Sequence, residues 1–304
     1  MSLFVVLLVL ISCVFHAGWN LQVKRWDATP AFFFFATVFV AVAAAPFFFW
    51  AGGVRVLTSA TPPVLWVCLT ITGLCQGAYY FFLARAYRAG DASVVYPIAR
   101  TAPLFVVPLA GLVQHAWPTV LALIGILLAV AGCFVLPRRS LDLRGEPFLS
   151  KTFFGPASRW ALATAAASAG YTVADAVGVA ALRNTLPGVR GAFVYGYLEA
   201  WTTGLWMTLG LLGTANGRSA TGRAWRTERG RAFALGGLIF GTYLLILWAY
   251  ALTDKTAHVA ALRQFSVVLG VAGGIRFLHE PRTAPRVLGA LIIVAGLILI
   301  ALGR

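Results

Sequence analysis

The residues of this sequence best suited to chemistry are charged side chains inside long apolar stretches. Arg100 lies within 92–108, ASVVYPIARTAPLFVVP, while Arg263, Asp175 and Glu199 lie in three other apolar stretches. A charge in such surroundings needs a partner, water or a ligand, and often marks a binding site or a proton pathway. The two arginines could hold an anionic group such as a carboxylate. Asp175 could then compete for Arg263 and release that group, with Glu199 as a second candidate.

The stretch around Arg100 also contains three prolines, Pro97, Pro103 and Pro108. Each proline removes a backbone donor and disturbs a helix. Broken backbone at membrane depth is tolerated where it lies against protein or lines a watery cavity. The stretch is therefore expected to face an interior pathway, with Pro97 and Pro103 as a helix break used in gating.

These charges are set in a chain whose composition is that of a membrane protein. Of 304 residues, 60% are hydrophobic and 11% are charged, and the mean hydropathy is +0.85. Soluble domains have about a quarter of their residues charged. The net charge of +15 would suggest nucleic acid in a soluble chain, but the basic residues lie in short runs between apolar segments. They are expected to orient the protein in a lipid bilayer, with no nucleic acid partner.

Ten apolar segments have the length needed to cross a bilayer, about 20 residues each. They are 3–23, 31–50, 63–84, 93–115, 118–136, 159–182, 191–213, 231–252, 257–278 and 284–302. Two long polar interruptions separate some of them, 137–158 and 214–230. The sequence thus predicts an all-α polytopic membrane protein with ten transmembrane helices.

The two halves of the chain repeat one another. A shift of 164 positions superposes glycines and tyrosines in the third and fifth segments of each half. The matched pairs are Gly77 with Gly241, Tyr79 with Tyr243, Gly125 with Gly289 and Gly132 with Gly296. Because five is odd, the second copy would cross the membrane in the opposite sense, as in many secondary transporters. The alternative is a chance match among residues that are common in spans. The predicted domains are a first five-helix repeat at 1–136, a linker at 137–158 and a second five-helix repeat at 159–304.

Polar and aromatic side chains within the segments are the candidates for lining a central cavity. Tyr79 and Tyr243, related by the repeat, could each stack on a ligand and form a hydrogen bond with it. The full candidate set is His16, Asn20, Tyr79, Tyr96, Arg100, Tyr171, Asp175, Tyr243, Arg263 and Gln264.

Helix depth gives these charges an expected arrangement. At about 1.5 Å per residue, Asp175 and Arg263 both lie about 10 Å below one membrane face, close enough in depth to pair. His16 and Arg100 lie about 10 Å below the opposite face by the same reasoning. One arginine would then flank the cavity on each side of the midplane. The alternative is that the arginines and acids merely neutralise one another within the bundle.

Three stretches resemble a known transporter family. They are HAGWN at 16–20 with Lys24 beyond it, AYRAGDASVVYPIARTAPLFVV at 86–107, and ALRQFSVVLGVAGG at 261–274 with the apolar segment that follows. The chain resembles EamA-type members of the drug/metabolite transporter superfamily over nearly its whole length. This resemblance implies two inverted five-helix repeats around a central cavity, with the fifth and tenth helices packed outside. It also implies movement of small metabolites, amino acids or drugs, commonly by export.

The first segment departs from one part of that superfamily. The short multidrug relatives have an essential glutamate in their first span, whereas this span has His16 and Asn20 and no carboxylate. Export of lipophilic cations coupled to protons by that particular residue is therefore not expected.

The basic residues also predict an orientation. Loops after odd-numbered segments contain 16 Lys and Arg, against five on the other face. The positive-inside rule then places both termini outside the cytoplasm. The family resemblance favours both termini inside, so the two arguments conflict.

The sequence favours a secondary transporter of a small solute with an anionic group, coupled to protons or another ion. It lacks the motifs of hydrolases and the phosphate-binding loop of ATPases, and its four cysteines show no metal-ligand spacing, so no enzyme, metal site or cofactor is expected. A lipid flippase or scramblase and a non-transporting membrane scaffold or sensor remain alternatives. The expected location is the inner membrane of a bacterium.

Overall fold

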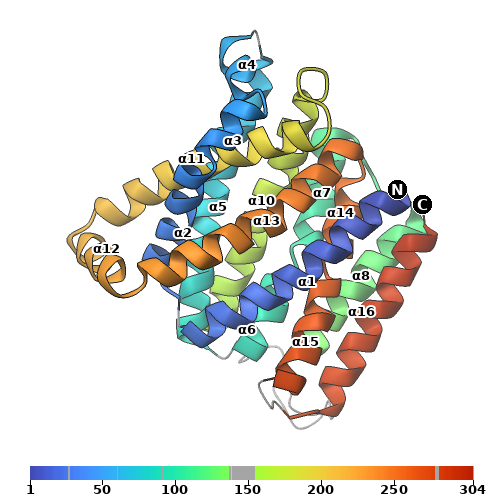
Figure 1. Ribbon diagram of the computed structural model, residues 1–304. Coiled ribbons are helices and arrows are strands. Elements are labelled where there is room, and N and C mark those ends of the chain that lie inside the picture. The colour runs from blue at the N-terminus through green and yellow to red at the C-terminus, as the bar shows by residue number, and fades with distance from the viewer. Residues whose placement is uncertain are drawn as a thin grey trace.

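A computed structural model of the chain shows a bundle of helices (Figure 1). The structure describes residues 1–26, 28–59, 61–90, 92–136, 138, 155–277 and 281–303, and this part of the chain contains no strand. The predicted linker 137–158 lies mostly outside it.

The helices of the first half follow the predicted apolar segments closely. They are α1 (Leu3–Trp26), α2 (Pro30–Ala43), α3 (Ala45–Trp50), α4 (Gly53–Thr58), α5 (Pro63–Ala89), α6 (Ala92–Ala99), α7 (Pro103–Gln114) and α8 (Val120–Val135). Two of the predicted segments are each divided between two helices, α2 with α3 and α6 with α7.

The second half shows the same correspondence. Its helices are α10 (Pro156–Ala181), α11 (Val189–Leu212), α12 (Ala215–Thr227), α13 (Arg229–Leu252), α14 (Thr256–Leu262), α15 (Phe265–Phe277) and α16 (Ala284–Leu302). The segment predicted at 257–278 is divided between α14 and α15, and α12 lies in a predicted polar interruption.

Length and hydropathy qualify six of the described helical stretches as membrane spans. They are Leu3–Val23, Pro63–Ala89, Val95–Gln114, Arg229–Leu252, Thr256–Phe277 and Ala284–Leu302. α2 and α8 are apolar but shorter. α10 and α11 are long enough, but α10 is rich in alanine, serine and threonine, and α11 contains many glycines, tyrosines and tryptophans.

Local sequence signals explain where several helices begin. The Thr29 side chain caps α2 by accepting a hydrogen bond from the Phe32 amide at 3.1 Å, and Thr119 caps α8 in the same way at 3.3 Å. Proline stands in the first turn of α2, α5, α7, α10 and α16, where a missing amide costs no helical hydrogen bond.

The core forms between the two halves of the chain. α5 packs against α10 and α11, α1 packs against α13 and α15, and α2 packs against α11 and α13. Each of these contacts joins a helix of the first half to helices of the second. Side chains from the two halves therefore meet throughout the interior.

α8 and α16 pack side by side at one edge of the bundle (Figure 1). Four glycines bring their backbones together. An added Cβ at Gly125 would lie 2.6 Å from the Gly296 carbonyl oxygen, and one at Gly132 would lie 2.7 Å from the Gly289 carbonyl oxygen. Glycine is required here because any side chain would meet backbone.

Two helices break near the middle of their apolar segments. The first break separates α6 from α7 at Arg100, Thr101 and Ala102, and the second separates α14 from α15 at Arg263 and Gln264. Prolines flank the first break, as predicted, with Pro97 inside α6 and Pro103 opening α7. No proline lies at the second break, so no local sequence signal marks it.

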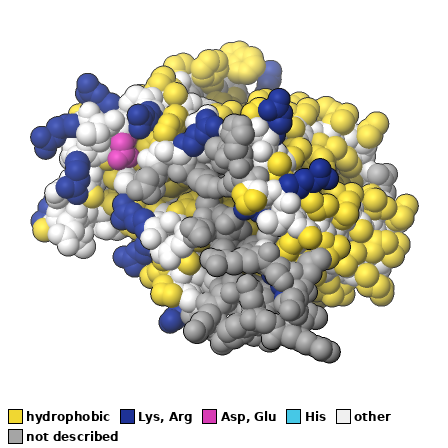
Figure 2. Space-filling view, turned by 90° about the horizontal axis from the view of Figure 1, so that it is seen from below, with side chains coloured by type: hydrophobic (Ala, Val, Ile, Leu, Met, Phe, Trp, Pro, Cys, Tyr) yellow, Lys and Arg dark blue, Asp and Glu magenta, His cyan; other side chains and the backbone are white. Residues whose placement is uncertain are grey.

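Basic and hydrophobic side chains are separated on one face of the molecule. Viewed from below, lysine and arginine side chains gather over one part of the surface and hydrophobic side chains cover another (Figure 2). α12 contributes exposed Arg218, Arg223 and Arg226 to the basic loops, which is the side that the sequence assigns the larger positive charge.

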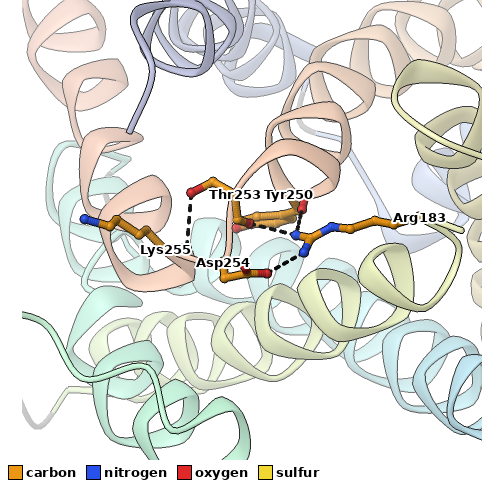
Figure 3. Close-up of polar contacts among 5 residues, drawn as sticks. All are labelled: Arg183, Tyr250, Thr253, Asp254 and Lys255. Carbon is orange, nitrogen blue, oxygen red and sulfur yellow. Dashed lines mark hydrogen bonds and ion pairs between the residues drawn. The ribbon is translucent and has the colours of Figure 1, made fainter.

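Arg183, which follows α10, contacts the end of α13 and the loop after it (Figure 3). Its guanidinium lies 2.6 Å from the Asp254 carboxylate and donates to the Tyr250 and Thr253 carbonyl oxygens at 2.8 and 3.2 Å. These carbonyls end α13 without helical partners, so Arg183 satisfies them.

Candidate functional site

A hollow opens between α2, α5, α11 and α13. Its volume is ≈ 480 Å³ with the space at its open mouth included. Two of its walls come from each half of the chain. Its lining residues are Ala36, Thr37, Val40, Gln76, Tyr80, Gly196, Glu199, Ala200, Thr203, Gly236, Ile239, Phe240, Tyr243, Leu244 and Leu247. We call this hollow the central cavity.

Several polar groups of the central cavity lack a hydrogen-bond partner. Glu199 is only 5% exposed, and its carboxylate makes no hydrogen bond or ion pair with any residue that the structure describes. Gln76 donates its amide nitrogen to the Tyr80 hydroxyl at 3.3 Å, but its amide oxygen has no partner. The buried hydroxyl of Thr203 also lacks one. Unsatisfied groups of this kind cost free energy unless a ligand or water meets them.

A second buried carboxylate, Asp175, lies beside the cavity and is fully hydrogen-bonded. Thr72 donates to Oδ1 at 2.6 Å, and Tyr195 donates to the same oxygen at 3.1 Å. Tyr243 donates its hydroxyl to Oδ2. Three donors from α5, α11 and α13 thus hold one acid of α10 in place. We call this set the aspartate cluster.

Arg263 reaches the aspartate cluster through an aromatic ring. Its guanidinium carbon lies 5.4 Å from the centroid of the Tyr243 ring, in the range of a cation–π contact. The predicted ion pair between Arg263 and Asp175 is not observed among the described residues. The two residues had been matched by depth, but depth does not determine which way each helix face points. Tyr243 stands between them and also lines the cavity.

Arg100 lies against the second helix break. It donates to the Arg263 carbonyl oxygen and to the Ser266 hydroxyl, both at 2.9 Å, and Ser266 donates to that same carbonyl at 2.7 Å. The arginine of one break therefore satisfies the backbone of the other. The sequence placed Arg100 and Arg263 on opposite sides of the midplane, flanking the cavity. The structure brings them together, and neither is among the cavity-lining residues. The long Arg100 side chain spans the distance that was expected between the two residues, so that its guanidinium reaches the Arg263 backbone.

The remaining predicted residues lie near these groups, with His16, Asn20 and Gln264 buried and Tyr96 partly buried. Asn20 donates to the His16 carbonyl oxygen at 2.9 Å, one helical turn away, and the His16 ring packs edge-on against Trp19. Tyr96 lies 3.5 Å from the Ser266 carbonyl oxygen, and Gln264 accepts a weak contact from the Cys133 thiol at 3.9 Å. None of these side chains lines the central cavity.

A row of tyrosines runs from the cavity into the bundle. Tyr79 packs edge-on against Tyr171, and Tyr171 packs edge-on against Tyr243, each at 5.7 Å between ring centroids. Of the two repeat-related tyrosines, Tyr243 lines the cavity, whereas Tyr79 is buried and its neighbour Tyr80 takes the lining position.

Two polar stripes in the sequence could have revealed the residues that the candidate set missed. Thr72, Gln76 and Tyr80 are spaced four apart in α5, which places them on one helix face. The same spacing recurs in α11, where Tyr195, Glu199 and Thr203 form the second stripe. Those stripes face the aspartate cluster and the central cavity.

Apolar helices of spanning length, packed around a hollow with buried charges, define an integral multi-pass membrane protein. The sequence profile of the EamA-like transporter family matches residues 3–137. This match places residues 3–137 in that family, which is part of the drug/metabolite transporter superfamily.

Solved structures agree on the fold. One, described only as the crystal structure of a protein, has a TM-score of 0.63 and 17% sequence identity, with 98% of each chain covered. At that identity the likeness concerns the fold alone. Comparison with curated proteins finds no match.

Proposed function

We propose that the protein is a secondary active transporter that moves a small organic solute through the central cavity by alternating access. The observation that carries this proposal is the cavity itself, walled by α2 and α5 from one half and by α11 and α13 from the other. A site between two halves can open to one side and then to the other as the halves rock.

We propose further that the ten apolar segments form two inverted five-helix repeats. The glycine contact of α8 and α16 supports this. Under the 164-residue shift Gly125 corresponds to Gly289, and Gly132 corresponds to Gly296. The contacts instead join Gly125 to Gly296 and Gly132 to Gly289. Such an exchange of partners is what a two-fold axis between equivalent helices produces.

The helix breaks fit the same symmetry. Arg100 and Arg263 lie 163 positions apart, one fewer than the repeat shift, so the two breaks occupy nearly equivalent places. Broken helices of this kind bind solutes and bend during transport in other inverted-repeat folds. In our proposal, Pro97 and Pro103 keep the first break open and let α6 and α7 move as separate pieces.

The aspartate cluster is proposed as the coupling element. Asp175 can take up or release a proton, and Tyr243 joins it both to Arg263 and to the cavity wall. A change at Asp175 would alter the hydrogen bond of Tyr243 and so the shape of the cavity. In this way proton movement and solute binding would act on one another.

Export is the proposed direction, across the inner membrane of a bacterium, with the more basic face in the cytoplasm. The orientation can be checked by fusing a periplasm-active and a cytoplasm-active reporter, in turn, to the C-terminal end. Periplasmic activity is expected, and cytoplasmic activity would reverse the assignment.

Purified protein in liposomes tests the transport proposal directly. The readouts are solute flux under a pH gradient and transbilayer movement of a labelled lipid. We expect Ala200→Leu, which places a larger side chain in the cavity wall, to reduce solute flux at least tenfold. Ala234→Leu is the matched control, because Ala234 is exposed on α13 and does not line the cavity. Lipid movement without solute flux would identify a scramblase instead, and no movement of either would favour a scaffold.

A further inference from the structure

Glu199 gives the central cavity a chemical preference. Glu199 lines the hollow from α11 and is only 5% exposed to solvent. Its carboxylate makes no hydrogen bond or ion pair with a described residue. An acid held in this way is satisfied by a proton or by a cation that enters the cavity. Asp175, by contrast, already accepts three hydrogen bonds and has little need of a ligand.

Two other polar atoms of the cavity lining have no hydrogen-bond partner among the described residues. The Gln76 amide oxygen can only accept, while one N–H of the same amide is donated to Tyr80. The Thr203 hydroxyl has no partner and can accept as well as donate. Glu199 and Thr203 are four residues apart, on the same face of α11. All three residues line the same cavity.

No basic side chain competes for this position. The lining of the central cavity contains no lysine, arginine or histidine. Arg100 is bound to the second helix break, and Arg263 packs on the Tyr243 ring. An anionic ligand in the cavity would therefore meet a carboxylate and find no lining cation.

The rest of the wall suits the apolar body of such a ligand. Tyr80, Phe240 and Tyr243 contribute aromatic side chains, and most other lining residues are aliphatic or glycine. Aromatic rings attract cations through their faces, and they also bury apolar surface.

We infer that the central cavity binds an organic cation, a protonated amine on an apolar body, with Glu199 as its counter-charge and Gln76 and Thr203 as hydrogen-bond acceptors. This inference rests on the proposed transport function, because it names the substrate class of the same cavity. It also replaces the anionic substrate that the sequence favoured.

Three ligands of nearly equal shape test the inference on the full-length protein. They are 2-phenylethylammonium, the neutral 2-phenylethanol and the anionic 3-phenylpropionate. Binding is measured by calorimetry in nanodiscs of zwitterionic lipid, so that lipid charge does not favour one probe. We expect the cation to bind at least tenfold more tightly than either analogue. Equal or tighter binding of the neutral or anionic probe would overturn the inference, and this comparison needs no variant.

Variants then assign the preference to Glu199. Glu199→Gln should lose at least tenfold in affinity for the cation, while Glu199→Asp should keep the order of the three probes. Asp254→Asn removes an equal charge at an exposed position outside the cavity and should bind as the wild type does. Unchanged binding in Glu199→Gln would also overturn the inference.

The outcome is separable from that of the transport proposal. Cation binding without flux in liposomes would leave this inference standing and refute transport. Flux of an anionic or neutral solute, with no binding of the cation, would do the reverse.

Discussion

The backbone contact of α8 with α16 makes a quantitative prediction about Gly296. A Cβ added there would lie 2.5 Å from the Gly125 carbonyl oxygen and 2.7 Å from the Ala129 amide nitrogen. Ordinary contact begins at 3.4 Å, so the two helices must separate by about 0.9 Å at this point. Neither atom belongs to a side chain that could turn aside. Gly296→Ala should therefore carry an overpacking cost of about 1 to 3 kcal/mol.

Gly241 provides the matched control. It lies within α13, and an added Cβ would meet nothing within 4 Å. Gly241→Ala should stabilise the protein by about 0.5 to 1 kcal/mol, the usual advantage of alanine over glycine inside a helix. The same advantage applies at Gly296, so the difference in unfolding free energy between the two variants isolates the packing cost.

Equilibrium unfolding of the purified protein in mixed micelles, followed by tryptophan fluorescence and circular dichroism, measures that difference. We expect Gly296→Ala to be less stable than Gly241→Ala by about 1 to 3 kcal/mol. Equal stability would show that α8 and α16 do not pack as closely as described, and would remove one support for the two-fold relation of the halves.

Three further predictions concern the interior and one surface contact. Tyr243→Phe keeps the ring but removes the hydroxyl that donates to Asp175. It should lower the unfolding free energy by about 1.5 to 3 kcal/mol, the range for hydrogen bonds to charged groups. An unchanged unfolding free energy in the same assay would contradict the contact. Pro97→Ala combined with Pro103→Ala should give normal amounts of folded protein and slower flux in liposomes, and wild-type flux would show that the prolines have no gating role. Arg183→Gln removes a solvent-exposed ion pair with Asp254 and two hydrogen bonds to carbonyl oxygens. The unfolding free energy should fall by less than about 1 kcal/mol. A much larger loss would mean that the Arg183 contacts hold α10 and the end of α13 together.

The positions of the helices could be predicted from the sequence because apolar length and proline are local signals. The first helix break illustrates this, since Pro97 and Pro103 mark it directly. The second break at Arg263 has no such marker. Its Arg263 carbonyl oxygen accepts a hydrogen bond from Arg100, which lies in the other half of the chain, and such a tertiary hydrogen bond leaves no local trace.

The candidate site could be predicted only in part. The depth argument matched Asp175 with Arg263 as a direct pair, whereas the structure places the Tyr243 ring between them, because depth along a helix says nothing about rotation around its axis. Glu199 had been a secondary candidate for proton exchange, and Gln76 was missed. Both lie on polar stripes whose spacing of four residues places them on one face, and such spacing is a better guide to a cavity than the charge of a single residue.

The contact of Arg100 with the second break also bears on how the protein is made. During synthesis the first half enters the membrane before Arg263 and Ser266 have been added to the chain, so the guanidinium has neither of its final acceptors. The Thr72 hydroxyl likewise lacks its acceptor until Asp175 has been added. An arginine without partners at membrane depth is costly, and it will keep water beside it or stay near the lipid head groups. The first half alone is thus an insertion intermediate in which Arg100 lacks its final hydrogen bonds. Synthesis of the α14–α15 segment is the step that supplies these acceptors.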